Sequence, residues 1–259
     1  MSGTTPPLIM IPGMQCTAAM FAPLQAELQR TLPGTRISTH VAGESSLTAA
    51  VASLARSITE PAVLVGHSLG GTVAMATARA HPELVAGMAL LCSNPNPPRL
   101  DQQQLWHEET EAATHGLVEE RVNGIVERLV GGERFLSPNE LASVTGICRA
   151  MVTETGPQGL INQLGIQKSR VDERPGLREF EGPVLSVVAA EDQLIPLPIA
   201  TETAFYARKG RNEVIHGVSH MAPLTTPEKV ASQLTRWLQE SFRDHQLTPS
   251  PSRTEKVAL

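Results

Sequence analysis

Short, uninterrupted runs of apolar residues alternate along the chain with segments in which apolar residues recur every three or four positions. The first pattern is typical of buried parallel strands, and the second is typical of helices that cover them. The predicted strands are the segments 7–11, 36–41, 62–66, 88–92, 183–190 and 212–216. The predicted helices occupy about 21–32, 47–58, 70–80, 198–207 and 226–242.

Capping signals mark the start of two of these helices. Ser45 and Ser46 stand just before the apolar repeat of segment 47–58 and are the candidates for its N-cap. Thr226 at the N-cap and Pro227 at the first helical position open the last helix. That helix turns four apolar residues toward the core, which are Val230, Leu234, Leu238 and Phe242.

Repeated strand–helix–strand units predict a doubly wound, mostly parallel sheet with helices on both faces. The segment 94–180 breaks this rhythm, because it contains helical patterns and no convincing strand. We therefore divide the chain into an α/β core, formed by 1–93 and 181–243, and a helical cap inserted at 94–180. The segment 244–259 is polar and interrupted by prolines, so we expect it to be disordered.

The composition limits the kinds of binding partner and the cellular compartment that we expect for the protein. The 259 residues are 41% hydrophobic, which is enough for a sizeable core. A net charge of −5 and an aromatic content of 3% give no basis for binding nucleic acid or an anionic membrane. The start of the chain lacks a basic region and a long apolar run, so we expect a cytoplasmic protein without a signal peptide. Three cysteines without a Cys-x-x-Cys pair fit free thiols in a reducing compartment.

The acidic charge is concentrated in the cap. Between Asp101 and Arg134 there are eight acidic residues and three arginines. Such a run is typical of a solvated helix face. It also makes this face unfavourable for docking an acidic carrier protein.

The candidate chemistry begins with the sequence Gly66-His67-Ser68-Leu69-Gly70. This matches Gly-x-Ser-x-Gly, a motif that presents a nucleophilic serine on a sharp turn between a strand and a helix. A predicted strand precedes the motif and a predicted helix follows it, as the turn requires. The alternative interpretation is an ordinary serine in a glycine-rich turn.

A serine hydroxyl becomes a good nucleophile only when a base takes its proton, and that base is usually a histidine held by a carboxylate. Asp192 follows the strand 183–190, and His220 follows the strand 212–216. Both therefore fall at the carboxyl edge of the sheet, where open α/β folds place their sites. Glu191 and His216 are the rival candidates. We prefer Asp192 because Pro196 follows four residues later, and His220 because it lies beyond the strand end.

An oxyanion formed by attack of Ser68 needs backbone N–H donors. Leu69 is one candidate, because it directly follows the serine at the start of a predicted helix. The second donor is expected in the loop after the first strand, where Met14 is the candidate. Pro12 in the same loop has no N–H and is excluded.

Taken together, these segments resemble those of the α/β-hydrolase family. GHSLGG, EDQLIP and SHMAP look like the nucleophile, acid and histidine segments of that family, and IPGMQCTAAMFAPL looks like its oxyanion segment. The resemblance covers about 7–93 and 183–243, and it implies that the insertion corresponds to the variable cap. Within the family, the Pro-Gly loop and the small cap look most like bacterial carboxylesterases of the type that includes pimeloyl-carrier methyl esterases.

The chain departs from the family pattern at three points. Pro12-Gly13 stands where the family often has His-Gly, and Ser219 replaces the usual glycine before the histidine. The first parallel strand also begins at the start of the sequence, so the N-terminal antiparallel hairpin of the family is expected to be missing. Members that open epoxides or displace halide use a carboxylate at the position of Ser68, so those reactions are disfavoured.

The resemblance and the residues together predict a serine hydrolase that acts on an ester, thioester or lactone of a small acyl group. An acyltransferase or a carbon–carbon bond hydrolase would use the same three residues, and a ligand-binding protein without catalysis is a third alternative. Trp106, His107, Met151 and Leu160 are candidates for the pocket lining, and of these we select Trp106 and Met151 as substrate-binding residues. We expect no metal site and no cofactor, a small-molecule partner, and leave the oligomeric state open.

Overall fold

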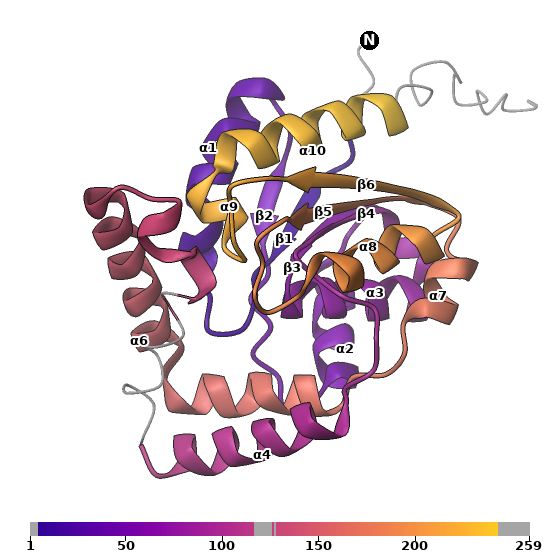
Figure 1. Cartoon of the computed structure of the whole chain (residues 1–259). Coiled ribbons are helices and arrows are strands. Elements are labelled where there is room, and N and C mark those ends of the chain that lie inside the picture. Colours follow the sequence, from indigo (N-terminus) through magenta and orange to yellow (C-terminus); the bar gives the residue numbers. More distant parts are fainter. Residues whose placement is uncertain (1–4, 117–125, 127, 243–259) are drawn as a thin grey trace, which may run out of the picture.

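The computed structural model describes residues 5–116, 126 and 128–242, and their core is a six-stranded sheet (Figure 1). The strands lie in the order β2-β1-β3-β4-β5-β6, and every neighbouring pair is parallel. The prediction of a parallel, doubly wound sheet is therefore confirmed. The strands are β1 Leu8–Ile11, β2 Ile37–Thr39, β3 Ala62–His67, β4 Val85–Leu91, β5 Pro183–Ala189 and β6 Lys209–Ile215.

Helices cover both faces of the sheet because the strand side chains alternate between two apolar layers (Figure 1). On β1, Leu8 and Met10 face the layer of α1 and α10, whereas Ile9 and Ile11 face the layer of α2 and α3. The α-helices of these two layers are α1 Ala22–Thr31, α9 Ala222–Thr225 and α10 Pro227–Ser241 on the first face, and α2 Leu47–Ser57, α3 Leu69–Ala80, α7 Arg174–Glu179 and α8 Leu197–Tyr206 on the second. Two short 3-10 segments, Ala18–Phe21 and Pro82–Leu84, complete the core.

The ends of the elements follow local rules, and several of them differ from the predicted bounds. Strand β2, for example, covers only Ile37–Thr39 of the predicted segment 36–41. Ser46 caps α2, because its side chain accepts a hydrogen bond from the Ala49 N–H. Strand β4 begins three residues earlier than predicted, since Ala86 and Gly87 are too small to give a strong apolar signal. Strand β6 also begins three residues earlier, because it lies at the sheet edge and its first residues alternate between exposed and half-buried polar side chains.

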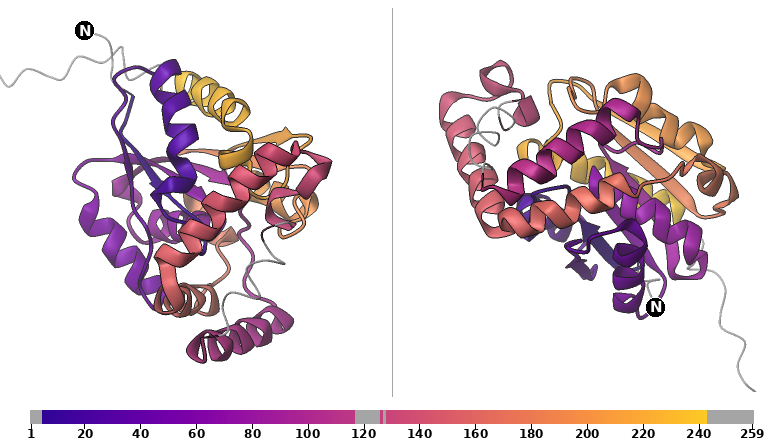
Figure 2. Two further views of the ribbon diagram at one scale, coloured as in Figure 1. Left: turned by 90° about the vertical axis from the view of Figure 1, so that its left-hand side faces the viewer. Right: turned by 90° about the horizontal axis from the view of Figure 1, so that it is seen from below.

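The inserted segment forms helices that lie across the carboxyl edge of the strands (Figure 1). These are α4 Leu100–Thr114, the 3-10 segment Gly132–Arg134 and α6 Pro138–Lys168. Helices α4 and α6 pack side by side, as Figure 2 shows. Helix α6 is broken at Gly156, where φ is 64°, and Pro157 starts its second half.

Two predictions fall outside the described residues. One is the helical pattern of the cap within 117–130, most of which is outside the described residues, and the other is the predicted disordered segment 244–259. In the described part of the chain, no helix combines the length and the apolar character needed to cross a membrane.

Candidate active site

Ser68 occupies the turn between β3 and α3 in a backbone conformation that residues other than glycine rarely adopt. Its φ is 51° and its ψ is −116°, and its N–H donates to the carbonyl of Leu91 at 3.0 Å. The turn is possible because glycine follows the serine closely. A Cβ atom on Gly70 would lie 1.9 Å from the carbonyl oxygen of Ile11, so helix α3 can approach strand β1 only with glycine there.

Asp192 and His220 meet at the same edge of the sheet. The Nδ1–H of His220 donates to Oδ2 of Asp192 at 2.7 Å, and both side chains are almost fully buried. The second carboxylate oxygen accepts from the Leu194 and Ile195 amides at 2.8 and 3.0 Å. Burial alone would raise the pKa of Asp192, but these hydrogen bonds lower it below its ordinary value. Asp192 is therefore a carboxylate at neutral pH, and it fixes the His220 tautomer that leaves Nε2 unprotonated.

The rival candidates lie away from this pair. The carboxylate of Glu191 accepts hydrogen bonds from the backbone amides of Gly217 and Val218 at 2.9 and 3.1 Å, so it holds the loop that leads to His220. His216 is exposed directly after β6. Neither rival takes part in the hydrogen bond between Asp192 and His220.

The loop around His220 is anchored to the cap on both sides of the histidine. The hydroxyl of Ser219 donates to the carbonyl of Arg128 at 3.1 Å, and the amide of Met221 donates to the carbonyl of Leu129 at 3.1 Å. Ser219, which replaces the glycine typical of the resembled family, therefore adds a hydrogen bond that glycine lacks.

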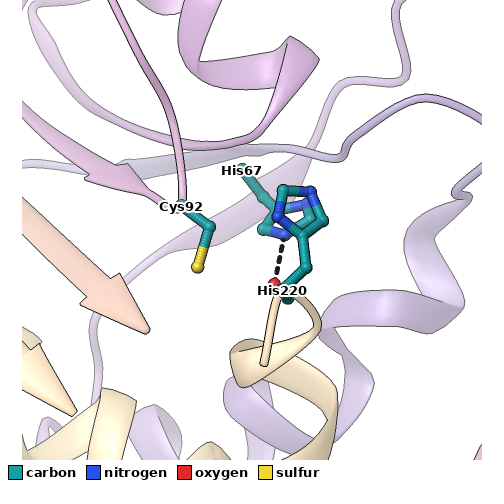
Figure 3. Close-up of side chains that lie close together, drawn as sticks. All are labelled: His67, Cys92 and His220. Atoms are coloured by element: carbon teal, nitrogen blue, oxygen red, sulfur yellow. Dashed lines mark hydrogen bonds between the residues drawn. The ribbon is translucent and has the colours of Figure 1, made fainter. Parts of the chain in front are cut away.

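His67 is a buried neighbour of His220 that the sequence analysis did not select. Its Nε2 lies 2.9 Å from the main-chain oxygen of His220, and the two rings are 4.8 Å apart (Figure 3). Burial and, next, the charge of His220 lower the pKa of His67 to about 3, so this ring is neutral at physiological pH. The only sequence signal was its place in the motif beside Ser68.

The nearby Cys92 makes a three-residue cluster with the two histidines (Figure 3), which raises the question of a metal site. One nitrogen or sulfur atom of each residue lies within 4.8 Å of the others. However, Asp192 already binds Nδ1 of His220, and the carbonyl of His220 binds Nε2 of His67. Burial and the charge of Asp192 raise the pKa of Cys92 well above its ordinary value, which disfavours the thiolate that a metal needs. The cluster does not fit a metal centre.

The two candidate oxyanion donors, Met14 and Leu69, both line one cavity with Ser68. Leu69 is the first residue of α3, so its N–H points out of the helix end. Within the described residues, neither amide has a hydrogen-bond acceptor. The neighbouring Gln15 has a φ of 57°, and its amide donates to the buried Oε1 of Gln163 from α6 at 2.7 Å. Helix α6 thereby holds the loop that carries Met14.

The cavity has a volume of about 240 Å³ and lies between the sheet edge and the cap. Ser68 and His220 both line it, although no hydrogen bond joins their side chains in the described structure. Of the cap candidates, Trp106 and Met151 lie on its wall. His107 is exposed on α4 and Leu160 packs behind Trp106, so neither lines the cavity.

The cavity wall is divided between apolar and polar residues. One group of apolar lining residues belongs to the core layer of α1 and α10, and it contains Cys16, Val126, Cys148, Met151 and Met221. The polar part is formed by Asn94, Gln102, Glu109, Gln167 and Arg170. The imidazole of His220, the strained Ser68 and the Met14 and Leu69 amides, which have no acceptor among the described residues, thus line a space that is large enough for a small molecule.

The sequence matches a known family over most of its length. The model of the Alpha/beta hydrolase family matches residues 8–233. A pimeloyl-[acyl-carrier protein] methyl ester esterase of Shewanella sp. (strain MR-7) is 24% identical over 260 residues, with coverage of 93% of this chain and 94% of the relative.

Solved structures show the same fold at low sequence identity. A malate-bound thermophilic esterase from Thermogutta terrifontis has a TM-score of 0.81 at 22% identity, and covers 92% of this chain and 91% of its own. The enol-lactonase from Burkholderia xenovorans LB400 has a TM-score of 0.77 at 15% identity, with 92% and 94% covered.

Proposed function

Because the chain belongs to the alpha/beta hydrolase family, we propose that it is a serine hydrolase that cleaves a small carboxylic ester through an acyl-enzyme on Ser68. Thioesters and lactones contain the same reactive carbonyl and belong to the same proposal. The observation that carries it is the buried Asp192–His220 pair beside a serine with a φ of 51° on the wall of one cavity.

The first half of the proposed reaction forms the acyl-enzyme. The Ser68 oxygen attacks the ester carbonyl carbon while Nε2 of His220 takes the hydroxyl proton. Asp192 stabilises the imidazolium that forms, and the amides of Met14 and Leu69 bind the oxyanion. When the carbon–oxygen bond to the leaving group breaks, His220 returns the proton to the departing alkoxide.

The second half releases the acid by hydrolysis. His220 takes a proton from a water molecule, and the resulting hydroxide attacks the acyl-enzyme carbonyl. Breaking the bond to Ser68 restores its hydroxyl, with the proton supplied by His220. The neutral His67 adds no positive charge next to the imidazolium, so it does not oppose either step.

We further propose that α4 and α6 act as the cap of the site and that Trp106 and Met151 contact the substrate. Both side chains are buried on the cavity wall, and the small volume favours a compact acyl group. Curated relatives carry the name of an esterase for a methyl ester on an acyl-carrier protein. The acidic stretch between Asp101 and Arg134 would repel an acidic carrier, so a free small ester is the favoured substrate.

A panel of p-nitrophenyl esters of increasing acyl length tests this proposal. We expect the wild type to hydrolyse the short esters and Ser68→Ala to lose on the order of 10⁶-fold in kcat. Ser57→Ala is the matched control, because the Ser57 hydroxyl bonds the Leu54 carbonyl at the end of α2. Full activity in Ser68→Ala would overturn the assignment. Product analysis with added alcohol or amine distinguishes hydrolysis from acyl transfer.

A further inference from the structure

Arg170 is a cation on the wall of the catalytic cavity that the proposed reaction leaves unused. It lies two residues beyond the end of α6, and its guanidinium sits 5.9 Å from the centre of the Trp106 ring. Burial lowers the pKa of Arg170 to about 10, which still leaves the group charged at neutral pH. Arg170 is half-buried, and a charge that is partly removed from water is costly unless a partner neutralises it.

Among the described residues, the acceptors that bond the guanidinium of Arg170 are all neutral. The guanidinium donates to Oε1 of Gln167 at 3.0 Å, to Oδ1 of Asn94 at 3.1 Å and to the main-chain oxygen of Asn96. No carboxylate of the described residues lies within 4 Å of it. Glu173 is the acidic residue whose charge acts on Arg170, but its carboxylate is already bound by Arg79 at 2.8 and 3.2 Å.

The surroundings of Arg170 contain more hydrogen-bond donors than acceptors. A guanidinium has five N–H groups, and these three hydrogen bonds use three of them. Asn94 and Gln167 turn their oxygens toward the cation, so their NH₂ groups remain as donors on the cavity wall. The side-chain nitrogen Nε2 of Gln15, another lining residue, is buried and has no partner within the described structure. Glu109, the acidic residue on this wall, has an interaction partner of its own.

This donor-rich wall is close to the reactive serine. The hydroxyl of Ser93 donates to the carbonyl of Ser68 at 3.2 Å, and the next residue, Asn94, accepts from Arg170. The guanidinium is therefore on the order of 10 Å from Ser68, given the spacing of consecutive residues. A hydrogen bond between the guanidinium and a bound molecule takes up part of this distance. About four to six covalent bonds of that molecule would span the rest, as far as the atom that Ser68 attacks.

We propose that Arg170 binds a carboxylate of the substrate, so that the hydrolysed ester belongs to a molecule with a second, anionic end. The inference rests on the proposed function of Ser68 and names the substrate class of the same cavity. A carboxylate neutralises the guanidinium and accepts a hydrogen bond from Nε–H or from the second Nη1–H, which are the two N–H groups without a partner among the described residues. These two groups lie on different edges of the guanidinium, so one carboxylate accepts from one of them at a time. The apolar part of the cavity then holds the other half of the ester.

Matched esters with and without the charge test this site by kinetics. Monomethyl adipate against methyl heptanoate places the carboxylate on the acyl half, and 4-carboxyphenyl butyrate against phenyl butyrate places it on the leaving group. We expect kcat/KM of the wild type to favour the anionic member of at least one pair. Arg170→Gln is expected to lower that preference about 10- to 100-fold, the range for a hydrogen bond to a charged group.

Arg174→Gln is the matched control, because Arg174 pairs with Asp172 and does not line the cavity. This variant should keep the wild-type preference. No preference for the anionic esters in the wild type, or an equal loss on both members of a pair in Arg170→Gln, would overturn the proposal, since a purely structural arginine affects both alike.

Binding measurements separate this inference from the proposed hydrolysis. Calorimetry of Ser68→Ala with monomethyl adipate and with dimethyl adipate requires no turnover and no substitution at Arg170. Tighter binding of the monoanion by at least tenfold supports the site even if no ester is hydrolysed. Equal or weaker binding of the monoanion overturns it, even if Ser68 proves to be the nucleophile.

Discussion

The Nε2 of His67 lies 2.9 Å from the main-chain oxygen of His220, so one buried histidine holds the backbone of the other. This bond requires the proton of His67 to be on Nε2, which leaves Nδ1 unprotonated and without a partner within the described residues. A Cβ atom on Gly13 would lie 2.8 Å from that Nδ1, so the loop after β1 closes over the unprotonated side of the ring. Protonation of His67 is therefore strongly disfavoured in the folded protein.

The stability of the protein should depend on pH through His67. Its pKa is about 6.5 in the unfolded chain and about 3 in the folded protein. As the pH falls below 6.5, the unfolded chain binds one proton more than the folded chain, so the free energy of unfolding decreases. The loss reaches about 1.4 kcal/mol per pH unit once the unfolded histidine is fully protonated. Asp192 also makes the protein less stable at low pH, because the stability that its carboxylate contributes to the fold is lost as the pH falls through its lowered pKa.

Urea unfolding of the wild type, His67→Gln and His216→Gln at pH 7, 6, 5 and 4 measures this effect. We expect a shallower pH dependence in His67→Gln, whatever its stability at pH 7, and the wild-type slope for the exposed His216→Gln. Identical slopes in all three proteins would show that His67 titrates normally in the folded state.

Asp192 and its neighbour Glu191 should differ sharply in their effect on catalysis. Asp192→Asn removes the charge that stabilises the His220 imidazolium and disturbs its tautomer, so we expect kcat to fall on the order of 10⁴-fold. Glu191→Gln keeps an oxygen that accepts from the Gly217 and Val218 amides, so its loss should stay below about tenfold. Initial rates of both variants on a short p-nitrophenyl ester measure the two losses. A larger loss in Glu191→Gln than in Asp192→Asn would assign the role of the acid to Glu191.

The sequence predicted the sheet and its candidate site better than the walls of the cavity. The strand patterns were sufficient to predict the parallel sheet, and this topology explains why Ser68, Asp192 and His220, which each follow a strand, lie at one edge of it. Their catalytic roles stay a prediction. The edge strand β6 was predicted too short, since the alternating polar residues of an edge carry little apolar signal.

The contacts that the sequence did not predict join residues that are far apart along the chain. His67 and His220 are separated by 153 positions, and Arg170 meets Asn94 across 76. No periodicity encodes such pairs, because they depend on how segments that are distant in the sequence come together in the fold. The same reason explains why Trp106 reaches the cavity whereas its neighbour His107 is exposed.

Gln163 should support the loop that carries Met14. Its buried side chain accepts from the Gln15 amide at 2.7 Å and donates to the Ala42 carbonyl at 3.2 Å. Gln163→Ala leaves both backbone groups without partners, so we expect a loss of about 1–3 kcal/mol in stability for each group that stays buried. We also expect kcat to fall more than KM rises, because the Met14 amide is proposed to bind the oxyanion only after attack.

Gln158→Ala is the matched control for this prediction. Gln158 lies on the same helix, is exposed and bonds only the side chain of Asn162 in the described structure. Thermal unfolding and initial rates of both variants provide the measurement. Equal kinetics in Gln163→Ala and Gln158→Ala would remove the proposed link between α6 and the oxyanion loop.

Gly70 should tolerate no side chain, whereas Gly146 should accept one. A Cβ atom at Gly70 would lie 1.9 Å from the Ile11 oxygen and 2.8 Å from the Pro12 oxygen, so Gly70→Ala must displace α3 or the loop that carries Met14. We expect a loss of about 3 kcal/mol or more in stability, together with reduced esterase activity. Gly146 lies within α6 with no atom within 4 Å of an added Cβ, so Gly146→Ala should stabilise the protein by about 0.5–1 kcal/mol. Chemical unfolding of the two variants measures whether the free energy of unfolding falls in Gly70→Ala and rises in Gly146→Ala. A Gly70→Ala protein as stable and active as the wild type would contradict the close approach of α3 to β1.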